Sequence, residues 1–192
     1  MPEDPKNFCL SGLNFQLELS GRYAHVVKNR WARGIPPRNF SWILKESLAV
    51  SERPGGYARN HRRVRRQEEI IWIREEGFQR VVSLLGSPHN LHAYEEFHVP
   101  YSHVPFGETD DPAVVLPELY RLLRGWIQKG ERILIHQEEL GDRMMGVVAG
   151  YLLWSGTLPT NTQAIVAVER LLSKQMGPEG RELVATIAGT KA

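Results

Sequence analysis

Cysteine is almost absent from this sequence, which has one, Cys9, among 192 residues. A single cysteine excludes an intramolecular disulfide, and with it the small secreted folds that disulfides hold together. The stability of the chain must therefore come from a hydrophobic core. The hydrophobic content of 42% is ordinary for a globular protein, and the length fits one domain with a full-sized core.

Long hydrophobic runs and net charge are also lacking. No stretch has the length and apolarity of a transmembrane helix, and the acidic start Met1-Pro2-Glu3-Asp4 does not resemble a secretory signal. The formal net charge of +2 gives no overall attraction to nucleic acid. We therefore expect a cytoplasmic protein with neither a membrane nor a nucleic acid as its partner.

Several segments repeat apolar residues at the spacing of an amphipathic helix. Residues 132–135, in contrast, form a short apolar run that is typical of a buried parallel strand. Alternation of strands and helices predicts an α/β fold with a mainly parallel sheet flanked by helices. The helices are expected at residues 20–33, 65–76, 112–129, 144–154, 160–174 and 178–188.

The segment from His136 to Arg143 lies between that strand and the helix expected to start at Met144. A loop that leads from a strand into a helix N-terminus exposes backbone N–H groups, and the helix dipole adds to their attraction for anions. The guanidinium of Arg143 would add a fork that matches a phosphate. The sequence therefore predicts an anion-binding loop at the carboxyl end of a strand, where open α/β sheets bind ligands.

This loop resembles the signature of bacterial-type, cysteine-dependent tyrosine and dual-specificity phosphatases, in which His-Cys is followed by five residues and Arg. His136 and Arg143 match the signature, and Gln137 stands where the family has its nucleophilic cysteine. An amide cannot ionise and is no nucleophile, so the resemblance implies a pseudophosphatase that lacks the first catalytic step. Cys9 is no substitute, because Phe15 follows it where the arginine belongs.

The rest of the loop departs from the family as well. Leu140 stands where the family has glycine, and Met144 stands where it has serine or threonine. Three loop residues are acidic, and a carboxylate about 5 Å from a phosphate would repel it by roughly 3 kcal/mol at an effective dielectric constant near 20. The candidate phosphate-binding residues are His136, Gln137, Glu138, Glu139, Leu140, Gly141, Asp142 and Arg143.

Other segments resemble the phosphatase family in the same order along the chain. Residues 40–43 and 48–51 are similar to its opening strand pair, 77–85 to a central strand, and 101–106 to the strand before the general-acid loop. The resemblance implies a single phosphatase-like domain over residues 40–192, with the signature loop between a central strand and a helix. Residues 1–39 are expected to form an N-terminal extension that covers the domain or docks a partner.

The general acid of the family is an aspartate on the loop after the strand at 101–106. Glu108 is nearest to that position without a gap, and Asp110 or Asp111 would take it in a longer loop. Alternatively, all three are solvated turn residues, with Asp111 capping the next helix. We favour the capping role for Asp111, because Asp-Pro at a helix start needs no catalytic explanation.

Two further clusters have a functional and a structural interpretation. The arginine cluster could contact the phosphates of a partner, but we favour a solvated loop whose arginines pair with Glu68 and Glu69. The histidine cluster has no metal-ligand spacing, so we expect neither a metal nor a cofactor. The first cluster comprises Arg53, Arg59, Arg62, Arg63, Arg65 and Arg66, and the second comprises His89, His92, His98, His103, Glu95 and Glu96.

Three functions remain compatible with the sequence. The leading hypothesis is a catalytically inactive phosphatase-like protein that binds a phosphorylated or acidic ligand or a protein partner. The second is a hydrolase of altered chemistry that uses loop carboxylates on a phosphoester. The third is a structural interaction domain with an empty loop. Turnover separates the first from the second, and anion binding that depends on Arg143 separates the first from the third.

Overall fold

The computed structural model describes residues 34–56 and 63–189. The predicted helix at residues 20–33 lies outside the described residues, as do Cys9, Arg59 and Arg62. The described elements are β1 (Ser41–Leu44), β2 (Leu48–Glu52), α1 (Arg63–Glu75), β3 (Arg80–Ser83), α2 (His92–Glu96), β4 (Tyr101–His103), α3 (Pro112–Gln128), β5 (Ile133–Gln137), α4 (Asp142–Trp154), α5 (Asn161–Leu172) and α6 (Pro178–Gly189).

The strands form one five-stranded sheet in the order β1-β2-β5-β3-β4, with β5 in the middle. β1 pairs antiparallel with β2, and the other three pairings are parallel. The predicted mainly parallel sheet and its central strand are therefore confirmed, with β1 as the antiparallel strand. The carboxyl end of β5, where the signature loop starts, lies between the ends of β2 and β3.

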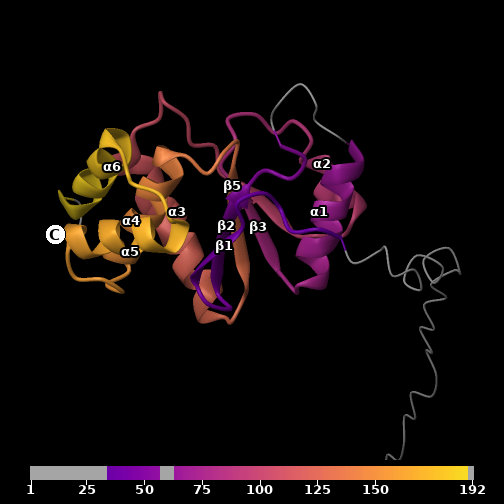
Figure 1. Cartoon of the computed structure of the whole chain (residues 1–192), viewed down its shortest axis with the longest axis horizontal. Helices are drawn as coiled ribbons and strands as arrows, with labels where there is room; N and C mark the ends of the chain where they lie inside the picture. The colour runs from indigo at the N-terminus through magenta and orange to yellow at the C-terminus, as the bar shows by residue number, and fades with distance from the viewer. Residues whose placement is uncertain (1–33, 57–62, 190–192) are drawn as a thin grey trace, which may run out of the picture. The chain divides into compact units, whose positions relative to one another are not determined.

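Helices cover both faces of the sheet. Figure 1 shows α3, α4, α5 and α6 on one side of it and α1 and α2 on the other. Successive residues of a strand point to opposite faces. Ile133 and Ile135 of β5 accordingly belong to the larger core under α3 to α6, whereas Leu134 belongs to the smaller core under α1 and α2. His136 therefore lies on the same face as Leu134.

Close packing holds α4 against its neighbours. A Cβ atom on Gly146 would lie 2.7 Å from the Cα of Gly180, so only glycine lets α4 and α6 approach this closely. The Tyr120 hydroxyl on α3 donates a hydrogen bond of 2.8 Å to the carbonyl of Val147. These contacts fix the helix whose N-terminus follows the signature loop.

The described chain before β1 packs on the α/β domain. The backbone N–H of Ile35 donates to the Glu68 carbonyl, and the N–H of Glu52 donates to the Arg38 carbonyl. Gly34 has a φ of +66°, and a Cβ there would lie 2.3 Å from the carbonyl oxygen of Glu68. Residues 34–39, which the sequence assigns to the extension, thus contact the domain directly.

The helices agree with the sequence pattern except at their ends and at α2. Both α1 and α4 begin two residues earlier than predicted, at Arg63 and Asp142. The sequence pattern does not reveal α2, because its five residues are too few to repeat a helical period. No helix in residues 34–56 and 63–189 combines the length and apolarity needed to span a membrane.

Candidate functional site

The signature loop connects β5 to α4. His136 and Gln137 are the last residues of β5, and Gly141 precedes the first turn of α4 without a side-chain cap. Among the described residues, no hydrogen bond uses the backbone N–H groups of residues 138–144 as donors. The loop therefore presents a row of open donors at a helix N-terminus, the arrangement that binds anions elsewhere.

Gln137 is tied to the segment that follows β4. Its side-chain Nε2 donates a hydrogen bond of 3.1 Å to the carbonyl of Phe106, and its own carbonyl accepts from the N–H of Arg53 at 2.8 Å. The side chain is half-buried. The amide at the nucleophile position thus joins the loop to a neighbouring segment and offers no group that could attack phosphorus.

The guanidinium of Arg143 is held by groups outside the loop. Its Nη1 donates to the carbonyl of Gly107 at 2.7 Å, and its Nη2 forms an ion pair with Glu179 in the first turn of α6. The charge also lies 5.3 Å from the centre of the Phe106 ring. A ligand that uses the fork of Arg143 must therefore compete with Glu179.

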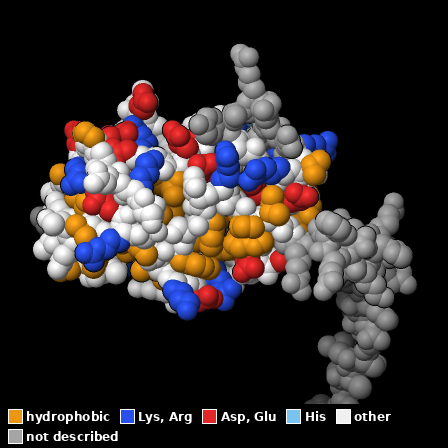
Figure 2. Space-filling view, in the orientation of Figure 1, with side chains coloured by type: hydrophobic (Ala, Val, Ile, Leu, Met, Phe, Trp, Pro, Cys, Tyr) orange, Lys and Arg blue, Asp and Glu red, His pale blue; other side chains and the backbone are white. Residues whose placement is uncertain are grey.

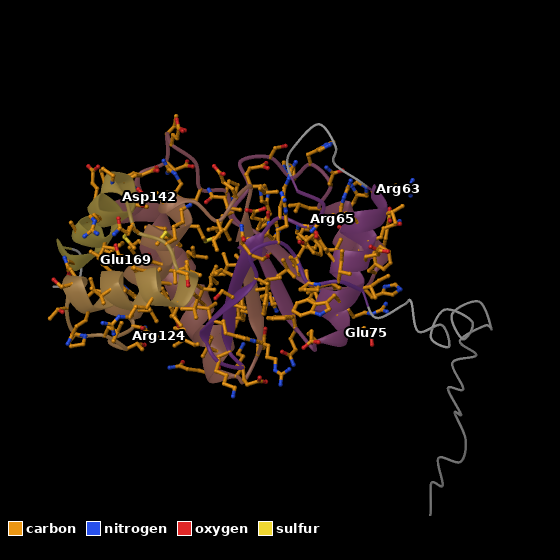
Figure 3. All side chains as sticks on the ribbon, in the orientation of Figure 1. Arg63, Arg65, Glu75, Arg124, Asp142 and Glu169 are labelled. Atoms are coloured by element: carbon orange, nitrogen blue, oxygen red, sulfur yellow. The ribbon has the colours of Figure 1, made fainter. Side chains whose placement is uncertain are left out.

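Two of the three loop carboxylates make structural contacts. Glu138 pairs with Arg53 at 3.0 Å, and Asp142 accepts from the N–H groups of Gly177 at 2.6 Å and Gly180 at 2.9 Å. Figure 3 shows Asp142 where α4 approaches α6. Glu139 is exposed. The predicted repulsion of an anion is thus reduced, because Arg53 offsets one charge and Asp142 is engaged by α6.

Solved structures resemble this chain, whereas no family model and no curated relative matches its sequence. The kinase associated phosphatase KAP, with serine at its catalytic cysteine, aligns with a TM-score of 0.68 and 22% identity over 81% of this chain and 97% of that one. Tk-PTP in its active form gives 0.62 and 20%, over 80% and 96%. Human DUSP28 gives 0.60 and 14%, over 83% and 99%. The fold is that of the tyrosine and dual-specificity phosphatases.

Two loop positions of this phosphatase fold serve in packing. Met144 is fully buried in the larger core, and Leu140 packs against that core. The carbonyl of Leu140 also accepts from the ammonium group of Lys174 at 3.2 Å. Neither side chain can supply the loop curvature or the hydroxyl that the family resemblance assigns to these positions.

The acidic residues after β4 differ in their contacts. Asp111 is the N-cap of α3 and accepts from the N–H of Ala113 at 2.9 Å, which confirms the capping role. Asp110 accepts from the N–H of Gly107 at 2.7 Å and so closes the turn that also holds Arg143. Glu108 is exposed. None of these three candidates for the general acid is therefore identified by a contact with the signature loop.

His136 of the signature is buried, with 1% of its surface exposed. Burial is the main cause that lowers the pKa of its imidazole to about 3, and the nearby charges of Arg53 and His103 contribute to this shift. The ring is therefore neutral at neutral pH. The sequence groups it with the anion-binding loop, but its position in β5 directs it to the face of α1 and α2.

The fold brings parts of the two clusters noted in the sequence together, since Arg53 and Arg66 line a cavity with His89, and Arg63 and Arg66 line a hollow with His92 and Glu96. Arg65 pairs with Glu69 at 2.7 Å, as the structural interpretation predicts, whereas Arg63 and Arg66 line a hollow between α1 and α2. Within the described part of the chain, the histidines and acids do not gather into a group that could hold a metal ion.

Proposed function

We propose that this chain is a catalytically inactive, bacterial-type and cytoplasmic phosphatase-like protein that binds a phosphorylated or acidic group at the signature loop. The observation that carries the proposal is the amide of Gln137 at the nucleophile position, hydrogen-bonded to the carbonyl of Phe106. A phosphatase of this type needs an ionised thiol there. With Gln137 at this position, the fold and the loop are kept, but nucleophilic attack on phosphorus is lost.

The retained backbone donors support the binding part of the proposal. The backbone N–H groups of residues 138–144 donate no hydrogen bond within the described chain, and the dipole of α4 adds positive potential at the same place. Arg143 ends the loop, and its guanidinium is held by Glu179 and Gly107. The ligand we infer is an acidic or phosphorylated side chain of a partner protein, which would replace Glu179 as the partner of Arg143.

Turnover of p-nitrophenyl phosphate tests the absence of catalysis. We expect no vanadate-sensitive hydrolysis above that of heat-treated protein. The Gln137→Cys variant should be inactive as well, because Leu140 and Met144 still lack the freedom of glycine and the hydroxyl of serine. Adding Leu140→Gly and Met144→Ser to this variant is expected to be the minimum needed for activity. Hydrolysis by the natural chain would disprove the proposal.

Binding of a phosphotyrosine peptide, measured by isothermal titration calorimetry, tests the ligand. We expect saturable binding that Arg143→Ala weakens about tenfold or more, because a charge-assisted hydrogen bond is lost. Glu179→Gln should strengthen it, because Arg143 is then freed from its carboxylate partner. Arg121→Ala is the control, since this exposed arginine pairs with Glu118 on α3. Equal binding by all four proteins would show that the peptide does not bind at the signature loop.

A further inference from the structure

A row of polar residues crosses the sheet on the face of α1 and α2. His136 is in register with Ser51 of β2 and Ser83 of β3, and Ser83 is in register with His103 of β4. Side chains at matched positions of neighbouring strands point to the same face. Ser51, Ser83 and His136 are all buried. On this face, the carboxyl ends of four strands thus present polar groups, whereas the rest of the sheet presents apolar ones.

Two of the polar side chains on this face are aimed at a cavity. Tyr94 of α2 and His136 both line it, with 2% and 1% of their surface exposed, and their rings lie 5.9 Å apart. Neither the Tyr94 hydroxyl nor either ring nitrogen of His136 has a hydrogen-bond partner among the described residues. Buried polar groups in native proteins are nearly always paired, so these atoms mark a place built for polar contacts.

The cavity opens toward a larger hollow. The inner cavity is lined by Arg53, Arg66, His89, Asn90, Tyr94 and His136 together with apolar side chains. Arg66 and Asn90 also line the outer hollow of about 260 Å³ between α1 and α2, which Arg63, Gln67, His92, Ala93 and Glu96 border as well. The inner cavity, at about 20 Å³, has room for about one oxygen atom, so a ligand could place one oxygen there while its remainder lies in the outer hollow.

The charges around the two spaces favour an anion. Burial lowers the pKa of Arg66, and the like charges of Arg53 and Arg63 lower it further, so positive charge is concentrated here. Figure 2 shows Lys and Arg side chains gathered beside α1 and α2 on the visible face. Glu96 of α2 borders the outer hollow and raises the pKa of Arg66, while the two oxygens of the buried Glu69 accept from the N–H of Gly55 and from Arg65.

The protonation states of Tyr94 and His136 also favour an anionic ligand. Burial is the main cause that raises the pKa of Tyr94, and the charge of Glu69 raises it further, so the phenol keeps its proton and can donate. The neutral imidazole of His136 offers one donor as well. Tyr94 and His136 each bring one donor, and the guanidinium of Arg66 brings donors alone, so a ligand with acceptor oxygens and a negative charge would satisfy them.

We propose that the cavity between α1, α2 and the end of β5 is a second binding site, specific for a small oxyanion group such as a carboxylate or phosphate. Tyr94 and His136 donate to the oxygen that enters the inner cavity, and Arg66, which lines both spaces, lies beside the rest of the anionic group. The site lies on the opposite face of the sheet from Arg143 and Glu179, so it does not depend on the function proposed for the signature loop.

Titration of the full chain with sodium acetate and with sodium phosphate, at constant ionic strength, tests this site. The readouts are calorimetry and the NMR signals of the His136 imidazole. We expect saturable binding of at least one anion with a shift of these signals, and about a tenfold loss of affinity in Tyr94→Phe and in Arg66→Ala. Acetamide, which is neutral, should not bind.

Two variants test whether the anion binds in this cavity or elsewhere on the protein. Tyr120→Phe removes a buried hydroxyl from the other face of the sheet and should leave anion affinity unchanged. Arg143→Ala should leave the His136 signals responsive even where it abolishes peptide binding at the signature loop. Absence of any saturable shift would overturn the proposal. So would anion binding that Arg143→Ala abolishes and Tyr94→Phe does not alter, or acetamide binding as tight as acetate binding.

Free anions and an anionic side chain of a partner are distinguished by a third titration. A peptide that carries aspartate or phosphoserine is added to the Arg143→Ala variant, in which the signature loop is disabled. Tighter binding of the peptide than of acetate or phosphate, still sensitive to Tyr94→Phe, identifies the partner side chain as the ligand. Binding of the free anions alone identifies a small-molecule site.

Discussion

The two faces of the sheet treat buried polar groups differently. Under α3 to α6, the buried Tyr120 hydroxyl donates to the Val147 carbonyl, and the half-buried Asp142 accepts from two N–H groups at the start of α6. Under α1 and α2, Tyr94 and His136 are as deeply buried, yet their polar atoms have no partner within the described residues. Satisfied groups stabilise a fold, whereas unsatisfied ones cost stability and are retained where a ligand uses them. The polar groups compared here therefore serve packing on the first face, whereas those on the second indicate a binding site in addition to the signature loop.

The largest expected effect comes from disrupting the packed face. Gly146→Val should lower the free energy of unfolding by about 3 kcal/mol, because its Cβ would collide with the backbone of Gly180. Urea denaturation followed by circular dichroism measures this. Gly125→Ala in α3 is the control: a Cβ there meets nothing within 4 Å, so the higher helix propensity of alanine should stabilise the fold by up to about 1 kcal/mol. Equal stability of both variants would contradict close packing of α4 and α6.

Asp142→Ala should have the next largest effect. It leaves the N–H groups of Gly177 and Gly180 without their charged acceptor, at an expected cost of about 2–3 kcal/mol. Asp111→Ala serves as a matched comparison, since it removes an exposed helix cap worth about 1 kcal/mol. The same denaturation measurement ranks the two. A smaller effect at Asp142 than at Asp111 would mean that this loop carboxylate is free to act elsewhere.

Acid should destabilise the protein through His136. The folded imidazole has a pKa of about 3 and the unfolded one about 6.5, so the unfolded state binds more protons between these values. The contribution of the buried neutral imidazole to the free energy of unfolding is fully present above pH 6.5 and is lost as the pH falls. The loss amounts to about 2 kcal/mol at pH 5. Unfolding free energies of the natural chain and His136→Gln, measured from pH 7.5 to 5, should converge on acidification. Parallel pH profiles would show that His136 is not buried in its neutral form.

Substitutions of the two buried tyrosines have the smallest expected effects on stability, and they compare the two faces most directly. Tyr120→Phe should cost about 1 kcal/mol, because it removes the hydrogen bond to Val147. Tyr94→Phe should raise the unfolding free energy by up to about 1 kcal/mol in buffer that contains no binding anion, because it removes a buried hydroxyl without a partner in the described chain. Thermal unfolding of both variants measures the difference. A larger loss for Tyr94→Phe would mean that its hydroxyl is satisfied by the fold itself.

The sequence predicts the sheet and most of the helices, since hydrophobic period and strand–helix order are local properties. The helix predicted at 112–129 ends one residue earlier, the strand predicted at 132–135 lies at 133–137, and Asp111 caps the helix. The short helix α2 is not predicted, because one turn carries no periodicity.

The contacts of the loop residues could not be predicted in the same way. Arg143 is paired with Glu179, Glu138 with Arg53, and Asp142 with the start of α6. Each pair joins residues more than thirty positions apart, and only the packing of the elements brings them together. The spacing of the signature identifies the loop but not the direction in which its side chains point.

The amide at position 137 makes the loop insensitive to oxidants. A thiolate at a helix N-terminus is readily converted by peroxide to a sulfenic acid, and this inactivates enzymes that depend on it. Gln137 has no such chemistry, and Met144, the nearest sulfur along the chain, is fully buried. A complex formed at this loop would therefore persist under oxidative stress, the condition that turns cysteine-dependent phosphatases off.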